Sequence, residues 1–100
     1  MFAIAFDLSS EEAQRHHPKG RRQAYGDIGR ALKDHGFNRV QGSVYLADEE
    51  NLVRLTEAMI TLRSLDWFAK SVANVRAFRV EQGSDFTGFI KTTSSQIEED

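Results

Sequence analysis

The chain opens with an uninterrupted apolar run, Met1 to Phe6, that ends at Asp7. A short apolar run without polar alternation is typical of a β-strand buried on both faces, since a strand with one wet face alternates. The run is far shorter than the roughly 18 apolar residues that span a membrane. No basic residue precedes it, so we do not expect a signal peptide. The run therefore predicts a strand at the centre of a sheet.

The rest of the chain alternates between helical and extended patterns. Residues 9–20 are polar and contain Pro18 and Gly20, which predicts a loop with at most a short turn at 10–12. Apolar residues at three- and four-residue steps predict helices over about 21–35 and 49–63, the first ended by Gly36 and the second capped by Asp48. The predicted strands are 2–8, 37–40, 43–47 and 75–80, with a turn at 41–42 and a short turn or 3₁₀ piece at 66–68.

This order, β-α-β-β-α-β, predicts a ferredoxin-like α+β sandwich. Its four-stranded antiparallel sheet has the first and third strands in the centre and both helices on one face. The other face has no cover from these elements. Phe86, Phe89 and Ile90 follow the last strand without a place in that core. We expect this C-terminal extension to pack on a second copy of the chain, within a single domain 1–91 followed by a disordered acidic tail, 92–100.

Composition narrows the class of protein. One hundred residues make one domain, and a domain of this size buries only about 60–65% of its unfolded surface, so a dimer interface would add core. The absence of cysteine excludes disulfides and thiolate metal sites, and it suits the cytoplasm. The net charge is −2, but the segment Arg15 to Arg39 is basic. It contains seven lysines and arginines and only two acidic residues, Asp27 and Asp34. Such a stripe indicates RNA binding or a merely solvated helix face.

Several segments resemble the virulence-associated protein D (VapD) family across residues 1–91. Each is unspecific alone, but together they occur in the family's order and spacing in a chain of the family's length. The matching segments are Ala5-Phe-Asp-Leu8, Gly36-Phe37, Val40-Gln-Gly-Ser-Val-Tyr45, Trp67-Phe68, Val75-Arg-Ala-Phe78, Val80-Glu81 and Ser84-Asp-Phe-Thr87. Residues 9–23 carry no such motif.

The resemblance implies properties that spacing cannot show. VapD proteins are similar in fold to the small CRISPR-associated nuclease that helps to insert new spacers. They form homodimers and act as endoribonucleases, and some are toxins beside a small antitoxin partner. In the CRISPR-associated relative an aspartate ending the first strand lies near the dimer axis, and Asp7 matches that position.

Asp7 is accordingly the candidate catalytic residue and metal ligand. Two such carboxylates about 5 Å apart would repel by about 3 kcal/mol at an effective dielectric constant of 20. Either one takes up a proton, or a divalent cation such as Mg²⁺ lies between them. The alternative is that Asp7 only hydrogen-bonds and caps the turn at Ser9 and Ser10.

The candidate substrate-binding residues are Ser9, Ser10, Lys19, Arg21 and Arg22. The serines follow the first strand and either hold a phosphate oxygen or act as helix N-caps. The cations lead into a helix N-terminus, which favours anions, and guanidinium binds phosphate with two hydrogen bonds.

Other polar and aromatic residues have two interpretations each. His16 and His17 could serve as acid and base but are expected to be exposed bystanders, and His35 is expected to cap its helix. Gln41 and Ser43 are expected to make hydrogen bonds at a sheet edge or, with the extension, at the dimer interface. The aromatic side chains are expected in the core rather than stacked on bases: Tyr25, Tyr45, Trp67 and Phe68.

Three functions stay open at this level. The first is a homodimeric endoribonuclease that uses Asp7 and acts as a toxin beside a small antitoxin partner. The second is a non-catalytic dimeric module that binds nucleic acid or protein. The third is a complex-forming partner whose acidic tail docks elsewhere.

Overall fold

The structure is a computed structural model, and it describes residues 1–81. The predicted extension at Phe86, Phe89 and Ile90 and the predicted tail 92–100 lie outside the described residues. The elements in chain order are β1 (Phe2–Leu8), α1 (Ser10–His16), α2 (Arg21–Lys33), β2 (Asn38–Gln41), β3 (Val44–Ala47), α3 (Leu52–Ser64), α4 (Asp66–Ser71) and β4 (Val72–Arg79).

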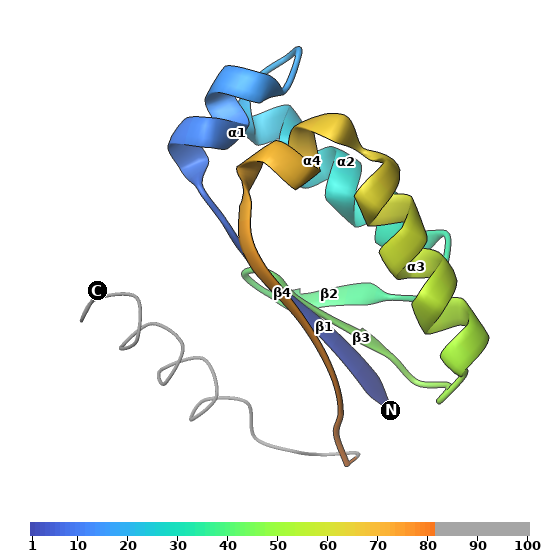
Figure 1. Ribbon diagram of the computed structural model, residues 1–100. Helices are drawn as coiled ribbons and strands as arrows, with labels where there is room; N and C mark the ends of the chain where they lie inside the picture. Colours follow the sequence, from blue (N-terminus) through green and yellow to red (C-terminus); the bar gives the residue numbers. More distant parts are fainter. Residues whose placement is uncertain (82–100) are drawn as a thin grey trace.

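The four strands form one antiparallel sheet in the order β2-β3-β1-β4. The predicted strands and their order are therefore confirmed, with β3 and β1 in the centre. α2 and α3 cover one face of this sheet, as Figure 1 shows, which is the ferredoxin-like arrangement. No helix among residues 1–81 is both long and apolar enough to cross a bilayer.

The core lies between the sheet and the helices. Alternate residues of β1 face the helices: Phe2, Ile4 and Phe6 are buried, and Leu8 is partly buried. They meet Ile28 and Leu32 of α2, both fully buried, as the apolar stripe of the first helix predicts. The alternation of side chains along a strand places Ala3, Ala5 and Asp7 on the opposite face of the sheet.

The segment 9–20, predicted to be a loop, contains the helix α1, so that prediction is wrong. Ser9 is its N-cap, and its hydroxyl accepts a hydrogen bond from the Glu12 N–H at 3.2 Å. The spacing Ser9-x-x-Glu12 is the signature of a capped helix start. Pro18 and Gly20 come after this helix, so they separate it from α2 rather than preventing it.

Two further boundaries differ from the prediction. The second long helix begins after Asn51 rather than Asp48, because the Asn51 side chain accepts from the Arg54 N–H at 3.1 Å. Glu50 instead binds the Met1 amino group at 2.9 Å and Arg79 at 2.8 Å. Leu52, in the first turn of this helix, is 66% exposed. The predicted turn at 66–68 is the short helix α4.

Candidate functional site

Asp7 lies at the carboxyl end of the central strand β1. It is opposite Asn74 of β4, and its Oδ2 accepts a hydrogen bond from Asn74 Nδ2 at 2.8 Å. The pairing of β1 with β4 shifts register directly after Asp7, and the strand then gives way to α1. The alternative that Asp7 caps the turn at Ser9 and Ser10 is wrong, since Ser9 caps α1 with its own hydroxyl.

The surroundings of Asp7 leave part of its carboxylate available. The side chain is half-buried, and the amide of Asn74 orients one oxygen without neutralising it. No cluster of three His, Cys, Asp or Glu side chains suited to a metal occurs among residues 1–81. One protomer therefore supplies a single carboxylate here, whereas Mg²⁺ is commonly held by one or two carboxylates with water and phosphate.

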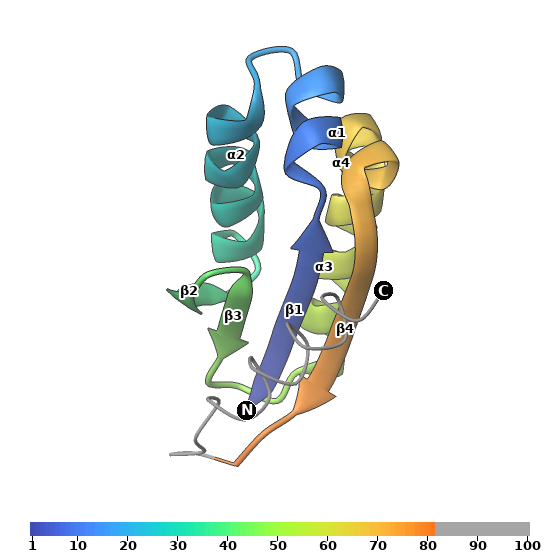
Figure 2. The same cartoon turned by 90° about the vertical axis from the view of Figure 1, so that its left-hand side faces the viewer.

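The predicted phosphate-binding cations do not adjoin Asp7. Lys19, Arg21 and Arg22 are exposed around the start of α2. α1 rises from the end of β1 and stands between Asp7 and this segment, as Figure 2 shows. A helix of seven residues is about 10 Å long. The sequence predicted a loop over 9–20 between Asp7 and these cations, and the helix α1 found there separates them instead.

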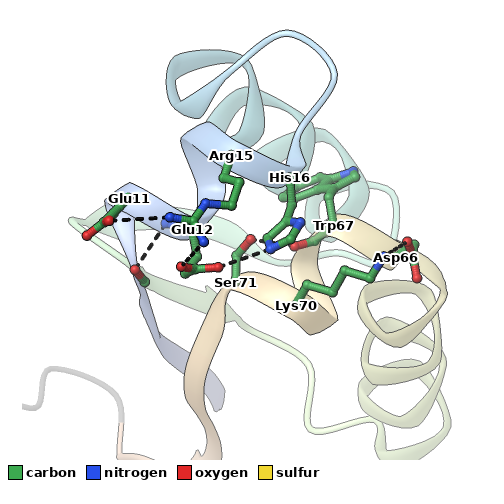
Figure 3. A network of polar contacts seen from close by, with 9 residues as sticks. Glu11, Glu12, Arg15, His16, Asp66, Trp67, Lys70 and Ser71 are labelled. Atoms are coloured by element: carbon green, nitrogen blue, oxygen red, sulfur yellow. Dashed lines mark hydrogen bonds and ion pairs between the residues drawn. The ribbon is translucent and has the colours of Figure 1, made fainter.

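Part of the basic segment is neutralised by neighbouring carboxylates. Arg15 lies 3.6 Å from Glu11 and 3.5 Å from Glu12, and His16 Nε2 lies 3.0 Å from Glu12, as Figure 3 shows. Arg30 pairs with Asp27 in the same way. The excess of positive charge in this segment is thus smaller on the folded surface than in the sequence. Residues three or four apart in a helix are neighbours, so these cations lie beside carboxylates.

His17 is buried rather than an exposed bystander. Its side chain is only 4% exposed, and its ring meets the Trp67 ring edge-on with centroids 4.6 Å apart. The Lys19 N–H donates to Nδ1 at 2.9 Å, so the proton of the neutral ring is on Nε2, which donates to Asp27 Oδ2 at 2.6 Å. Both nitrogens are occupied, so His17 links α1 to α2 and is not free for catalysis.

Asp27 is the acceptor at the centre of this link. The hydrogen bond from His17, with further contributions from Gln23 and the Arg30 guanidinium, lowers the pKa of Asp27 below its usual range. The fold therefore favours the ionised carboxylate. His35 makes a comparable link at the other end of α2, where its Nε2 lies 2.8 Å from Thr61 Oγ1 of α3.

The hairpin turn between β2 and β3 lies beside the end of β1. The Phe6 N–H donates to the Ser43 carbonyl at 3.2 Å, which brings Ser43 next to the residue that precedes Asp7. Gln41 is exposed on the edge strand β2, and Ser43 is half-buried. Their predicted role in a dimer interface stays a prediction.

The aromatic residues are in or against the core, as expected. Tyr45 and Phe68 are buried and both contact the Phe6 ring, with centroids 6.0 and 5.8 Å apart. Tyr25 and Trp67 are half-buried against the same cluster. Tyr45 nevertheless reaches the surface of a groove beside α2, a feature that apolar periodicity does not reveal.

Comparisons with known proteins agree with this fold. A family model described as CRISPR associated protein Cas2 matches residues 1–87. Among curated proteins, the endoribonuclease VapD homolog of Neisseria gonorrhoeae is 48% identical over 92% of this chain and all of its own length. The endoribonuclease VapD of Haemophilus influenzae is 50% identical over 91% of this chain and 99% of its own. That of Helicobacter pylori is 39% identical over 92% of this chain and all of its own length.

Proposed function

The chain belongs to the VapD family, within the wider Cas2 family, and we propose from this membership that it is an endoribonuclease that works as a homodimer in the cytoplasm. RNA is the substrate class that the names of the relatives specify. The observation that carries the assignment of the site is the position of Asp7, half-exposed at the end of the central strand with its carboxylate oriented by Asn74.

Dimerisation would complete this site. The sheet face that bears Asp7 also carries Ala3 and Ala5, and within residues 1–81 the helices cover only the opposite face. A second copy placed on the face that these helices leave uncovered would bring its own Asp7 to the same surface. A two-fold interface of this kind joins identical patches, so each residue meets a partner from the other copy. Gln41 and Ser43 at the hairpin turn, with Phe86, Phe89 and Ile90 beyond the described residues, are the proposed contacts.

A shared pair of Asp7 carboxylates would also fit a divalent cation such as Mg²⁺. The fit rests on the donor set: one half-exposed carboxylate per protomer, oriented by an amide that leaves its charge intact. When bound, such an ion stabilises negative charge on a phosphoryl oxygen and orients water or a hydroxyl. Asp7 itself would hold the attacking group in position and accept its proton.

The exposed cations at the start of α2 would bind RNA away from the cleaved bond. Lys19, Arg21 and Arg22 present their side chains to solvent, and phosphate contacts of this kind set position without reading bases. Ser10 is exposed at the start of α1, whereas the Ser9 hydroxyl already accepts from Glu12. We therefore assign Ser9 to capping α1 and Ser10 to a phosphate contact.

The test compares wild type with Asp7→Ala on a defined single-stranded RNA, with Mg²⁺ or with EDTA, after light scattering has established the particle mass. We expect both proteins to have twice the monomer mass and only the wild type to cleave. Cleavage by Asp7→Ala at the wild-type rate would refute the role of Asp7. Salt-sensitive RNA binding by the wild type without cleavage under any divalent ion would indicate a non-catalytic module instead.

We further propose that the enzyme is the toxin of a toxin–antitoxin pair, with a small protein as its antitoxin. The support is the family likeness alone. Expression of the chain should arrest growth of a bacterial host, and Asp7→Ala should not. Equal toxicity of the two forms would refute an arrest caused by RNA cleavage.

A further inference from the structure

A groove of about 680 Å³ lies between α2 and the β2–β3 hairpin. Figure 2 shows these elements together at the β2 edge of the sheet. The volume of the groove is within the range of pockets that hold a drug-sized ligand. Ser43 is one of the lining residues, and its carbonyl accepts a hydrogen bond from the N–H of Phe6, the residue before Asp7. The groove therefore shares a lining residue with the surroundings of the end of β1.

α2 presents two glycines to this groove. Gly26 and Gly29 are three residues apart in the helix, and neither has the positive φ that would require glycine. Glycine inside a helix costs about 1 kcal/mol relative to alanine. A Cβ at Gly29 would lie 3.6 Å from the Tyr45 hydroxyl, which is an ordinary contact, so the fold itself has room for alanine. Both glycines line the groove without a side chain, and Gly29 leaves space beside the tyrosine hydroxyl.

Tyr45 provides a buried ring with a hydrogen-bonding group at the groove. The residue is only 3% exposed, and its hydroxyl has no hydrogen-bond partner within residues 1–81. No side-chain oxygen or nitrogen in this range is both buried and unpaired, so the hydroxyl opens onto the groove that Tyr45 lines. Burial raises the pKa of Tyr45, which keeps the hydroxyl protonated and able to donate.

Two cations border the groove, and neither has a carboxylate partner within residues 1–81. These cations are Lys33 and Arg39, and no Asp or Glu is among the described residues that line the groove. Arg39 Nε donates to the Gly42 carbonyl at 2.8 Å, which fixes the guanidinium and leaves its two terminal nitrogens available. Arg15 and Arg30 are different, because each pairs with a carboxylate. The groove thus combines two cations that have no carboxylate partner in the described part of the chain with the side chains of two tyrosines.

We propose that this groove binds one unpaired nucleotide of the RNA substrate. Its base lies beside Tyr25 and accepts a hydrogen bond from the Tyr45 hydroxyl, and its phosphate contacts Lys33 and Arg39. Proteins recognise single-stranded RNA by placing aromatic side chains beside its unstacked bases and cationic side chains beside its phosphates. The proposal rests on the RNA-cleaving function proposed above and names where that substrate is held.

The experiment measures binding alone, so that it can fail separately from cleavage. A fluorescent RNA oligonucleotide is titrated in EDTA with the full chain carrying Asp7→Ala, and anisotropy gives Kd. Added to this background, Gly29→Ala and Tyr45→Phe are each expected to weaken binding about fivefold or more, the equivalent of one lost hydrogen bond. Gly29→Ala should leave the thermal midpoint unchanged or higher, so its effect cannot come from unfolding.

A matched pair of charge variants completes the test. Lys33 and Arg63 each lie in the last turn of a long helix, but only Lys33 borders the groove. Lys33→Gln should weaken binding severalfold, and Arg63→Gln should leave Kd within a factor of two. Wild-type affinity of both Gly29→Ala and Tyr45→Phe, or equal losses in the two charge variants, would overturn the groove proposal. If the groove variants weaken binding and the wild-type protein does not cleave RNA, the groove proposal is supported and only the nuclease proposal is refuted.

Discussion

The end of β1 and the groove beside α2 lie close together but carry opposite chemistry. Asp7 supplies a carboxylate held by a neutral amide, on the sheet face that the helices leave free. The groove, on the other side of the hairpin turn, carries Lys33 and Arg39 with tyrosines and without a carboxylate. The carboxylate suits proton transfer or a cation, and the groove suits an anion. On the proposals above, cleavage therefore depends on Asp7 and RNA binding depends on the groove residues, so a substitution should disrupt one without the other.

The largest expected effect is on the rate of RNA cleavage, which should depend on the end of β1 and not on the groove. Asp7→Asn keeps the size of the side chain and removes its charge, so we expect cleavage under single-turnover conditions to slow about 10²–10⁴-fold. RNA affinity should stay within a factor of three, because the binding groups are elsewhere. A loss of affinity as large as the loss of rate would contradict the division.

The next prediction tests whether a second reactive region exists at the top of the helices. His17→Ala removes a buried ring with two hydrogen bonds and leaves Asp27 without its main donor. We expect the free energy of unfolding to fall by about 1–3 kcal/mol, whereas His16→Ala at the surface should cost much less. Cleavage at a temperature where the variant is folded should persist. Abolished cleavage at unchanged stability would place His17 in the reaction and break the comparison.

A smaller effect concerns the salt dependence of binding. Each phosphate contact to single-stranded nucleic acid contributes about 0.7 to the slope of log K against log salt. The double variant Lys33→Gln, Arg39→Gln should therefore flatten that slope by about 1.4. The control is Arg63→Gln, Lys70→Gln, away from the groove, and its slope should match that of the wild type. Equal flattening in both would show that the groove holds no phosphate.

The smallest effect is on acid stability. The pKa of Asp27 is lowered in the fold, so its contribution is present above the unfolded pKa, about 3.9, and is lost as pH falls through the folded value. Thermal unfolding of wild type and Asp27→Asn should differ at pH 6, and the difference should shrink below about pH 4. A difference that grows on acidification would reverse the assigned direction.

The sheet could be predicted from sequence because its signals are local. The apolar run at Phe2–Phe6, the positive-φ Gly36 and the apolar stripe of α2 each specify an element directly. α1 was missed because Pro18 and Gly20 outweighed the capping signal at Ser9. The predicted cap was Asp48, but the Asn51 side chain caps α3, and Glu50 forms ion pairs with the Met1 amino group and Arg79 that the sequence does not reveal.

The candidate site was less predictable because it depends on pairing across the fold. Counting charges marked the whole basic segment, but the structure pairs Arg15, His16 and Arg30 with carboxylates. Tyr45 occupies a core position in the sequence pattern, and only the packing of Gly29 opposite its hydroxyl shows that it reaches a groove.

The central claim is that two protomers share one reactive site through their Asp7 residues. Mixed dimers with one wild-type and one Asp7→Asn protomer, isolated with two different affinity tags, test this claim most directly. If the carboxylates act as a pair, the mixed dimer should cleave RNA as slowly as the dimer with both residues replaced. Half of the wild-type rate would show that each protomer works alone, and the shared site would be wrong.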